Sequence, residues 1–144
     1  LDGEIKILNK DEIKFAYRKA TFPSKGGIII EANFDLEKGK ITDIHSSMDK
    51  YLSRRSSTQP LTMPNSGSVF KNPEGDKAGR LIESAGLKGC RIGGASVSIK
   101  HANFIVNKGN ASAVDVINLI KHIQTVVEEK SGKKLKQEII VIGQ

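Results

Sequence analysis

The sequence is poor in the residues that build disulfides and metal clusters. Its one cysteine, Cys90, excludes an internal disulfide framework and a cysteine-rich zinc site, and suits a reducing cytoplasm. Three scattered histidines form no metal cluster, so we expect no bound metal. No apolar run approaches the roughly 20 residues that cross a bilayer. We therefore expect a cytoplasmic protein with no membrane span.

Aromatic residues are also scarce, while positive charge is in excess. Tryptophan is absent and aromatics make up 5%, which leaves few platforms for stacking nucleic-acid bases. The net charge is +7, and residues 60–144 carry twelve basic against seven acidic side chains. This surplus predicts an anionic partner. A small phosphorylated ligand is favoured over nucleic acid, which needs interleaved aromatics.

The 144 residues are enough for one domain, or for one domain and part of a neighbour. The first residues, Leu-Asp-Gly-Glu, include no starting Met, basic region or apolar region, so we expect an internal start within a longer protein. The run Ser-Ser-Thr-Gln-Pro at 56–60 is a natural boundary. We predict two parts, residues 1–58 and residues 59–144.

Periodicity predicts a mixture of strands and helices. The expected strands are residues 4–8, 28–34, 95–99, 102–107 and 138–142, with a turn at 23–27. The expected helices are residues 42–56, 77–85 and a long one opened by Ser112 and Asp115 as a capping box and ended by Gly132. The type of segment 15–18 stays open. Because strands and helices do not alternate, we predict an α+β fold.

Three constellations could carry chemistry. Ser68 follows Gly67 in a tight turn, where it could cap the backbone or donate a hydrogen bond at a site. The glycine-rich loop 86–94 holds Lys88 and could be a plain loop or a phosphate site. Glu138 precedes an apolar run, where it could point to solvent or be catalytic.

Two further residues have ordinary interpretations. His101 at the start of a strand is by default partly exposed and satisfied. Cys90 has no histidine near it in sequence, so we interpret it as structural.

Four blocks occur in an order that one family shares. They are FAYRKATF (15–22), TQPLTMPNSGSVFKNP (58–73), AGRLIESAGLKGCRIGGASVSIKHANFIVN (78–107) and LKQEIIVIG (135–143). The chain resembles the C-terminal half of the UDP-N-acetylenolpyruvoylglucosamine reductases, flavoenzymes of bacterial cell-wall synthesis. The interval between Arg18 and Ser68 resembles the shorter class, which lacks an inserted loop with a substrate-covering tyrosine.

This resemblance implies an oxidoreductase of peptidoglycan synthesis. NADPH reduces FAD, and the flavin passes hydride to UDP-N-acetylglucosamine enolpyruvate to give UDP-N-acetylmuramate. By position in the family's motifs, Ser68 donates the proton, while Arg18 and Glu138 hold the substrate carboxylate and transient enolate. The types suit the chemistry, because a guanidinium stabilises a developing enolate and a preorganised hydroxyl delivers a proton.

The resemblance also implies binding residues. Asn72, Lys88 and His101 match substrate positions near the UDP diphosphate, and Arg55 is a weaker match for a phosphate of flavin, NADPH or substrate. Residues 1–58 would end the second FAD-binding lobe, and residues 59–144 would be the substrate-binding domain. We expect the FAD to be held mainly by a domain preceding this sequence, and this chain alone to be monomeric and inactive.

Two departures and two alternatives stand beside this reading. Lys19-Ala20 follow the Tyr17-Arg18 pair where many relatives have an acid or amide and then serine, and Ile140 stands where many have arginine. The chain could instead be a standalone module that binds UDP-sugars without redox chemistry. Nucleic-acid binding is the second alternative and the least favoured, because interleaved aromatic residues are missing.

Overall fold

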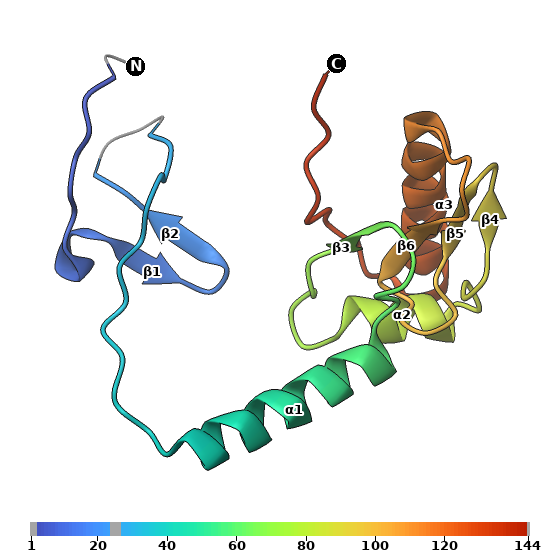
Figure 1. Ribbon diagram of the computed structural model, residues 1–144. Coiled ribbons are helices and arrows are strands. Elements are labelled where there is room, and N and C mark those ends of the chain that lie inside the picture. Colours follow the sequence, from blue (N-terminus) through green and yellow to red (C-terminus); the bar gives the residue numbers. More distant parts are fainter. Residues whose placement is uncertain (1–2, 24–26, 144) are drawn as a thin grey trace. The chain divides into compact units, whose positions relative to one another are not determined.

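The computed structural model describes residues 3–23 and 27–143, which fall into two compact units, Leu1–Gly39 and Lys40–Gln144 (Figure 1). The predicted turn at 23–27 lies largely outside the described residues. The predicted boundary between residues 58 and 59 falls inside the second unit and stays a prediction.

The first unit contains a short hairpin. After the 3₁₀ turn η1 (Lys10–Glu12), strands β1 (Lys14–Ala16) and β2 (Lys19–Thr21) pair antiparallel, with Ala16 opposite Lys19. Segment 15–18, left open by the sequence, therefore forms one strand end and the loop of this hairpin. The strands predicted at residues 4–8 and 28–34 are wrong, because neither segment has a ladder partner among the described residues.

Helix α1 (Ile41–Thr58) begins the second unit and confirms the helix predicted at 42–56. None of its eighteen described residues is buried. Ile44, Met48 and Leu52 recur along one side at helical spacing and are 46–58% exposed. The helix thus has an apolar stripe that the described residues leave uncovered.

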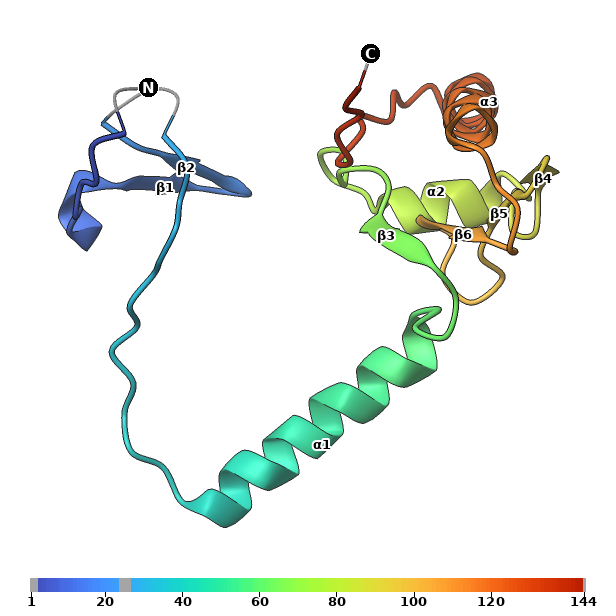
Figure 2. The ribbon, with the colours of Figure 1, turned by 45° about the horizontal axis from the view of Figure 1, so that its top comes forward.

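A four-stranded antiparallel sheet forms the centre of the second unit, in the order β3-β6-β5-β4. Its strands are β3 (Asn65–Ser68), β4 (Arg91–Ile92), β5 (Ala95–Val97) and β6 (Phe104–Asn107). Strands β5 and β6 confirm the two strands predicted there. Helices α2 (Ala78–Ser84) and α3 (Ala113–Ser131) lie beside this sheet (Figure 2).

The ends of both helices follow local sequence signals. Ser112 Oγ accepts from the Asp115 amide at 3.1 Å, while Asp115 accepts from the Ser112 amide at 2.9 Å, which completes the predicted capping box. Gly132 ends α3 with a φ of 68°, a left-handed conformation that costs glycine little. Gly86, with a φ of 77°, follows α2 in the same way.

One core joins the two helices to a single face of the sheet. Leu119, Ile120, Ile123 and Val127 of α3 are buried in it. From the sheet, the same core contains Ala95, Val97 and Ile105. Alternation along β5 and β6 then turns the intervening side chains to the second face.

The predicted C-terminal strand at 138–142 is wrong. The chain makes one isolated bridge, between Gln137 and Phe70, and then runs on with Ile140 and Ile142 more than 80% exposed. An apolar run becomes a strand only where neighbouring strands receive it. The α+β class is confirmed, with three α-helices and two antiparallel sheets among the described residues.

Candidate functional site

Ser68 ends β3 at a point where the strand bends. Gly67 before it has a φ of 79°, and the pairing of β3 with β6 shifts register between Asn65 and Ser68. Asn65 fixes this bend, because its Oδ1 accepts from the Gly67 amide at 2.9 Å and its Nδ2 donates to the carbonyl of Met63 at 2.8 Å. The predicted serine is therefore held, half-buried, on a locally constrained strand end.

The register places Ser68 on the second face of the sheet. Ser68 pairs with Phe104, and Ser96 pairs with Val106 on the neighbouring strands. Paired side chains share a face, and positions two apart along β6 share one too. Ser68 and Ser96 therefore lie on the same face, opposite the one that packs against α2 and α3.

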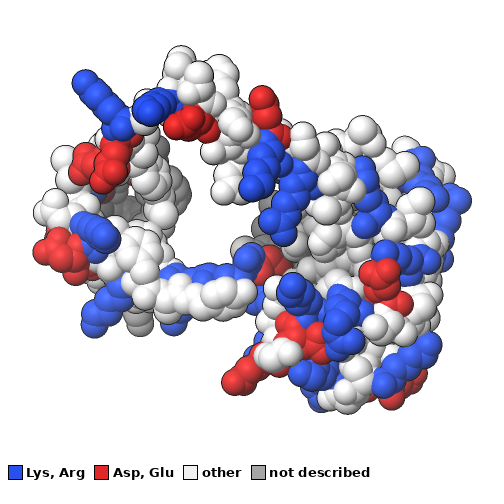
Figure 3. Space-filling view, turned by 90° about the horizontal axis from the view of Figure 1, so that it is seen from below, with Lys and Arg blue, Asp and Glu red and all other residues white. Residues whose placement is uncertain are grey.

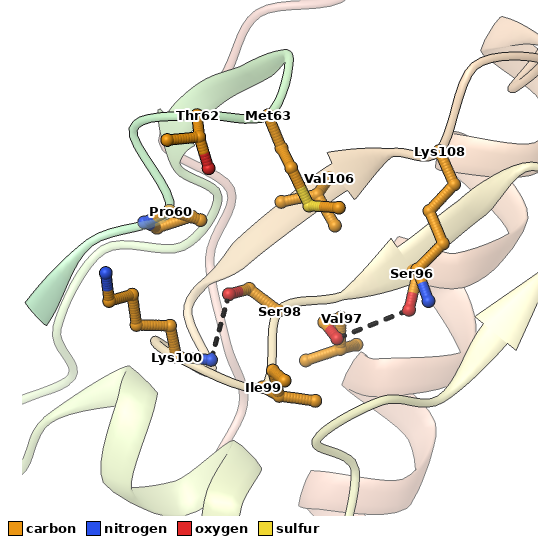
Figure 4. A pocket seen from close by; sticks show the side chains of 10 residues that line it. All are labelled: Pro60, Thr62, Met63, Ser96, Val97, Ser98, Ile99, Lys100, Val106 and Lys108. Carbon is orange, nitrogen blue, oxygen red and sulfur yellow. Dashed lines mark hydrogen bonds between the residues drawn. The ribbon is translucent and has the colours of Figure 1, made fainter.

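A pocket of about 430 Å³ lies on this second face (Figure 4). Its lining includes apolar walls, two serine hydroxyls and two ammonium groups, from Met63, Val106, Ser96, Ser98, Lys100 and Lys108. Ser98 Oγ accepts from the Lys100 amide at 3.1 Å, and Lys100 Nζ donates to the Ser56 carbonyl at 2.5 Å. None of the seven predicted site residues, all of which are described, lines this pocket.

Glu138 is brought next to the serine segment by backbone pairing. Its amide donates to the Val69 carbonyl at 2.8 Å, and the Lys71 amide donates to the Lys136 carbonyl at 2.8 Å. The C-terminal segment thus runs beside the chain that directly follows Ser68. Ser68 and Glu138, 70 positions apart in the sequence, are brought near each other because the Glu138 amide bonds the residue directly after Ser68.

Asn72 has a structural contact of its own. Its Oδ1 accepts from the amide of Ala78, the first residue of α2, at 3.0 Å. This bond satisfies one amide at the start of the helix, where no intrahelical acceptor exists. The predicted substrate residue therefore also fixes where α2 begins.

Lys88 and His101 come together around Glu83. Lys88 Nζ lies 2.6 Å from Glu83 Oε1, with the lysine side chain 32% exposed. The His101 ring packs edge-on against Phe104, with ring centroids 4.7 Å apart. The charges of Lys88 and Glu83 both act on the pKa of His101, so the three side chains lie near one another. We call this ion pair with its neighbouring histidine the charged cluster.

The protonation of His101 follows from its surroundings. Partial burial is the largest influence and lowers the pKa of His101 below its usual value. A hydrogen bond to its own backbone opposes this shift, the positive charge of Lys88 adds to it, and the negative charge of Glu83 opposes it. Nδ1 accepts from the Asn103 amide at 3.2 Å. The ring is therefore neutral at pH 7 with its proton on Nε2, which can donate to an anion.

Asn103 is a residue that the sequence interpretation missed. It is 5% exposed, and its side chain bonds the backbone of Phe70 at both polar atoms. A signal for it was present, because an amide between the apolar residues of the strand predicted at 102–107 requires partners. In the structure Asn103 lies in the turn directly before β6.

Residues 59–142 match the family profile of the UDP-N-acetylenolpyruvoylglucosamine reductase C-terminal domain. The chain belongs to this family. It is 48% identical over 143 residues to UDP-N-acetylenolpyruvoylglucosamine reductase 2 of Bacillus anthracis, and 49% identical over 143 residues to the reductase of Oceanobacillus iheyensis. Each alignment covers 99% of this chain and 47% of the relative, so the chain spans about half the length of these reductases.

A solved structure supports the same relationship. The crystal structure of UDP-N-acetylenolpyruvylglucosamine reductase from Thermus caldophilus matches with a TM-score of 0.81 at 38% identity. The match covers 96% of this chain and 48% of that chain. At this identity the likeness extends beyond fold class to the family itself.

Arg18 and Arg55 are the two remaining predicted site residues. Arg18 belongs to the first unit, at the hairpin loop, with a φ of 53° that non-glycine residues seldom adopt. Such a conformation costs energy and is often kept for function. Arg55 is exposed in the last turn of α1. The hydrogen bond between the Glu138 amide and the Val69 carbonyl lies within the second unit.

Basic side chains are spread over the second unit. Figure 3 shows Lys and Arg across the visible face of this unit, with fewer Asp and Glu between them. No group of three or more possible metal ligands occurs in residues 3–23 and 27–143. Within the same ranges, no helix is long and apolar enough to cross a membrane.

Proposed function

We propose that this chain forms the substrate-binding part of a reductase that converts UDP-N-acetylglucosamine enolpyruvate to UDP-N-acetylmuramate with FAD and NADPH, in peptidoglycan synthesis. The observation that carries the proposal is the bond between the Glu138 amide and the Val69 carbonyl. It joins the segment of the proton-donating serine to that of the glutamate that the family's motifs place at the substrate. In this proposal residues 59–144 bind the substrate and residues 1–58 belong to the flavin-binding part.

Ser68 is the proton donor in this mechanism. Reduction of the enolpyruvyl group adds a hydride to one carbon and a proton to the neighbouring carbon, which bears the carboxylate. The bend at Gly67 and the pairing with Phe104 restrict where the hydroxyl of Ser68 can lie. A preorganised donor reaches the transition state with little loss of freedom.

In this proposal Arg18 and Glu138 interact with the negative charge that develops on the substrate during reduction. Negative charge grows on the carboxylate-bearing carbon, so the guanidinium of Arg18 stabilises the enolate. An ionised Glu138 would repel the same enolate. Glu138 therefore acts in its protonated form, or through a polarised water or a hydrogen-bond network.

The charged cluster takes the diphosphate. Lys88 supplies a charge-assisted contact, and neutral His101 donates from Nε2. Asn72, held at the start of α2, lies between this cluster and Ser68 in sequence. We also propose that the reductase acts in the cytoplasm and that it is a monomer.

The cofactor contact proposed for this chain is a single arginine. Arg55, the one residue predicted for a cofactor phosphate, is exposed on a helix whose eighteen described residues include none that is buried. We therefore propose that FAD is bound mainly by the part of the reductase that the relatives have beyond the matched region. No step of the mechanism given for this chain depends on the placement of the cofactor.

The test is product formation by the complete flavin-loaded reductase that contains this chain. The wild type should oxidise NADPH and form UDP-N-acetylmuramate from the enolpyruvyl substrate. Ser68→Ala should slow product formation by about 10²–10⁴-fold, because a positioned acid contributes that much. Reduction of the flavin by NADPH, followed alone in a stopped-flow instrument, should keep its wild-type rate.

Ser66→Ala is the matched control, since Ser66 lies on the same strand and is exposed. It should leave both half-reactions unchanged. A wild type that forms no product would overturn the proposed function. If Ser68→Ala slows both half-reactions equally, or neither, the role of Ser68 is wrong.

A further inference from the structure

The side chain of Asn103 hydrogen-bonds the backbone of Phe70 as the main chain of a neighbouring strand would. Its Oδ1 accepts from the Phe70 amide at 3.0 Å, and its Nδ2 donates to the Phe70 carbonyl at 2.8 Å. Its main-chain carbonyl accepts from the Val69 amide at 2.9 Å. Three bonds therefore tie one buried residue to the two residues that follow Ser68.

This arrangement requires a carboxamide. The Phe70 backbone offers one donor and one acceptor, and at neutral pH a carboxamide in one orientation satisfies both, whereas an ionised carboxylate does not. The residue is 5% exposed, so a missing partner would not be replaced freely by water. Packing alone would be satisfied equally by an apolar residue of the same size.

Asn103 also connects the elements that carry the other predicted site residues. The main-chain amide of Asn103 donates to Nδ1 of His101 at 3.2 Å. On the opposite side, the Val69 carbonyl accepts from the Glu138 amide. The chain after Ser68 is thus held between Asn103 and the C-terminal segment.

We propose that Asn103 is a positioning residue that sets the placement of Ser68 relative to Glu138 and His101 by clamping the backbone at Phe70. It touches no reacting atom and acts through Val69 and Phe70. The inference rests on the proposed reductase function. It adds that the accuracy of proton donation depends on a side-chain amide outside the serine motif.

The decisive variant is Asn103→Asp, which keeps size and shape. Ionised, the new carboxylate still accepts from the Phe70 amide but faces the Phe70 carbonyl without a donor. Protonated, it has both a donor and an acceptor, as the amide does. Burial beside a carbonyl should raise the pKa of the new carboxyl above the ordinary 3.9 or so of aspartate.

We expect the variant to lose proton transfer at high pH and regain it at low pH. Misplacement of a catalytic group by about 1 Å can cost on the order of 100-fold. The rate of flavin reoxidation by the enolpyruvyl substrate, divided by the wild-type rate at each pH, should rise as pH falls. This ratio cancels the titration of every group whose pKa the substitution leaves unchanged. Flavin reduction by NADPH should match the wild type throughout.

A second measurement does not depend on turnover. In ¹H–¹⁵N spectra of the 144-residue chain carrying Asn103→Asp, the Phe70 amide should titrate with the same midpoint as the rate ratio. Asn107→Asp is the control, because Asn107 lies at the far end of β6, the strand that begins directly after Asn103, and its Oδ1 accepts from the amides of Gly109 and Ala111. It should show a flat ratio.

Each outcome is decisive. A pH-independent ratio near one, or equal loss in both half-reactions, overturns the positioning role. Wild-type protein that fails to reduce the enolpyruvyl substrate would instead overturn the proposed function. If the Phe70 amide of Asn103→Asp titrates but the rate ratio does not change with pH, Asn103 contributes to stability and not to the placement of Ser68.

Discussion

Lys88 is held by an acidic neighbour before any ligand arrives. Its ammonium lies 2.6 Å from Glu83, whose side chain is 58% exposed. A phosphate that approaches Lys88 must compete with this carboxylate. We expect Lys88→Ala to weaken the binding of UDP-N-acetylglucosamine by about 1–3 kcal/mol, the worth of a charge-assisted bond. Glu83→Gln should strengthen it, because the competing charge is removed while the side chain keeps its shape.

Isothermal titration at two salt concentrations checks both changes. Added salt should weaken binding to the wild type and to Glu83→Gln, and affect Lys88→Ala less. Lys121→Ala, an exposed lysine on α3, is the control for loss of one positive charge. If Lys121→Ala weakens binding as much as Lys88→Ala does, the effect of Lys88 is due to net charge and not to a direct contact. If Lys88→Ala leaves the affinity unchanged, Lys88 is not part of the binding site.

At the scale of residues, the sequence predicted chemical types better than contacts. The serine block and the C-terminal glutamate carry family motifs, so Ser68 and Glu138 could be named as candidates. Their junction at Val69 could not be predicted, because it joins distant segments through backbone atoms that every residue possesses. For Asn103 the sequence showed that the amide would need partners, but not that its partner is Phe70, which is 33 positions away.

At the scale of elements, Gly94 in the turn between β4 and β5 lies close against the backbone of another segment. A Cβ at Gly94 would overlap the backbone of Asn110 and Ala111, which cannot move aside as a flexible side chain can. Gly94→Ala should therefore destabilise the chain by about 1–3 kcal/mol, as overpacking typically does. Thermal and urea unfolding of the 144-residue chain measure this change.

Gly79 provides the opposite case inside α2. A Cβ there would meet His101 and Asn103 at 3.5 Å or more, which is ordinary contact. Gly79→Ala should stabilise the helix by roughly 0.5–1 kcal/mol, because alanine loses less entropy on folding. If both substitutions shift the midpoint equally, the steric account of Gly94 is wrong.

The elements also show which local signals suffice to predict structure. Helices α1, α2 and α3 were predicted because capping residues and apolar spacing act within a few positions. The strands at 28–34 and 138–142 were predicted on β-branched content and were wrong. A strand needs a partner ladder, and content alone cannot supply one.

At the scale of the molecule, burial is concentrated in one part of the second unit. The core contains α2, α3 and one face of the sheet, with Ile82 and Leu119 fully buried. By contrast, Ile28, Ile29 and Ile30 in the first unit are 67–79% exposed, and α1 exposes its apolar stripe. Local stability follows buried contacts, so it should differ sharply along this chain.

Hydrogen exchange of the 144-residue chain measures this difference directly. Amides of Leu119–Val127 in α3 should exchange only through global unfolding, while those of residues 28–34 and of α1 should exchange by local opening, orders of magnitude faster. Residues 139–142 should also exchange fast, since among the described residues the pairing of this segment ends at the Glu138 amide bond to Val69. The measurement should be repeated over a tenfold range of protein concentration. Protection of α1 or of residues 28–34 that rises with concentration would show that association of chains covers their apolar surface. Protection equal to that of α3 at every concentration would contradict the uneven burial on which the prediction rests.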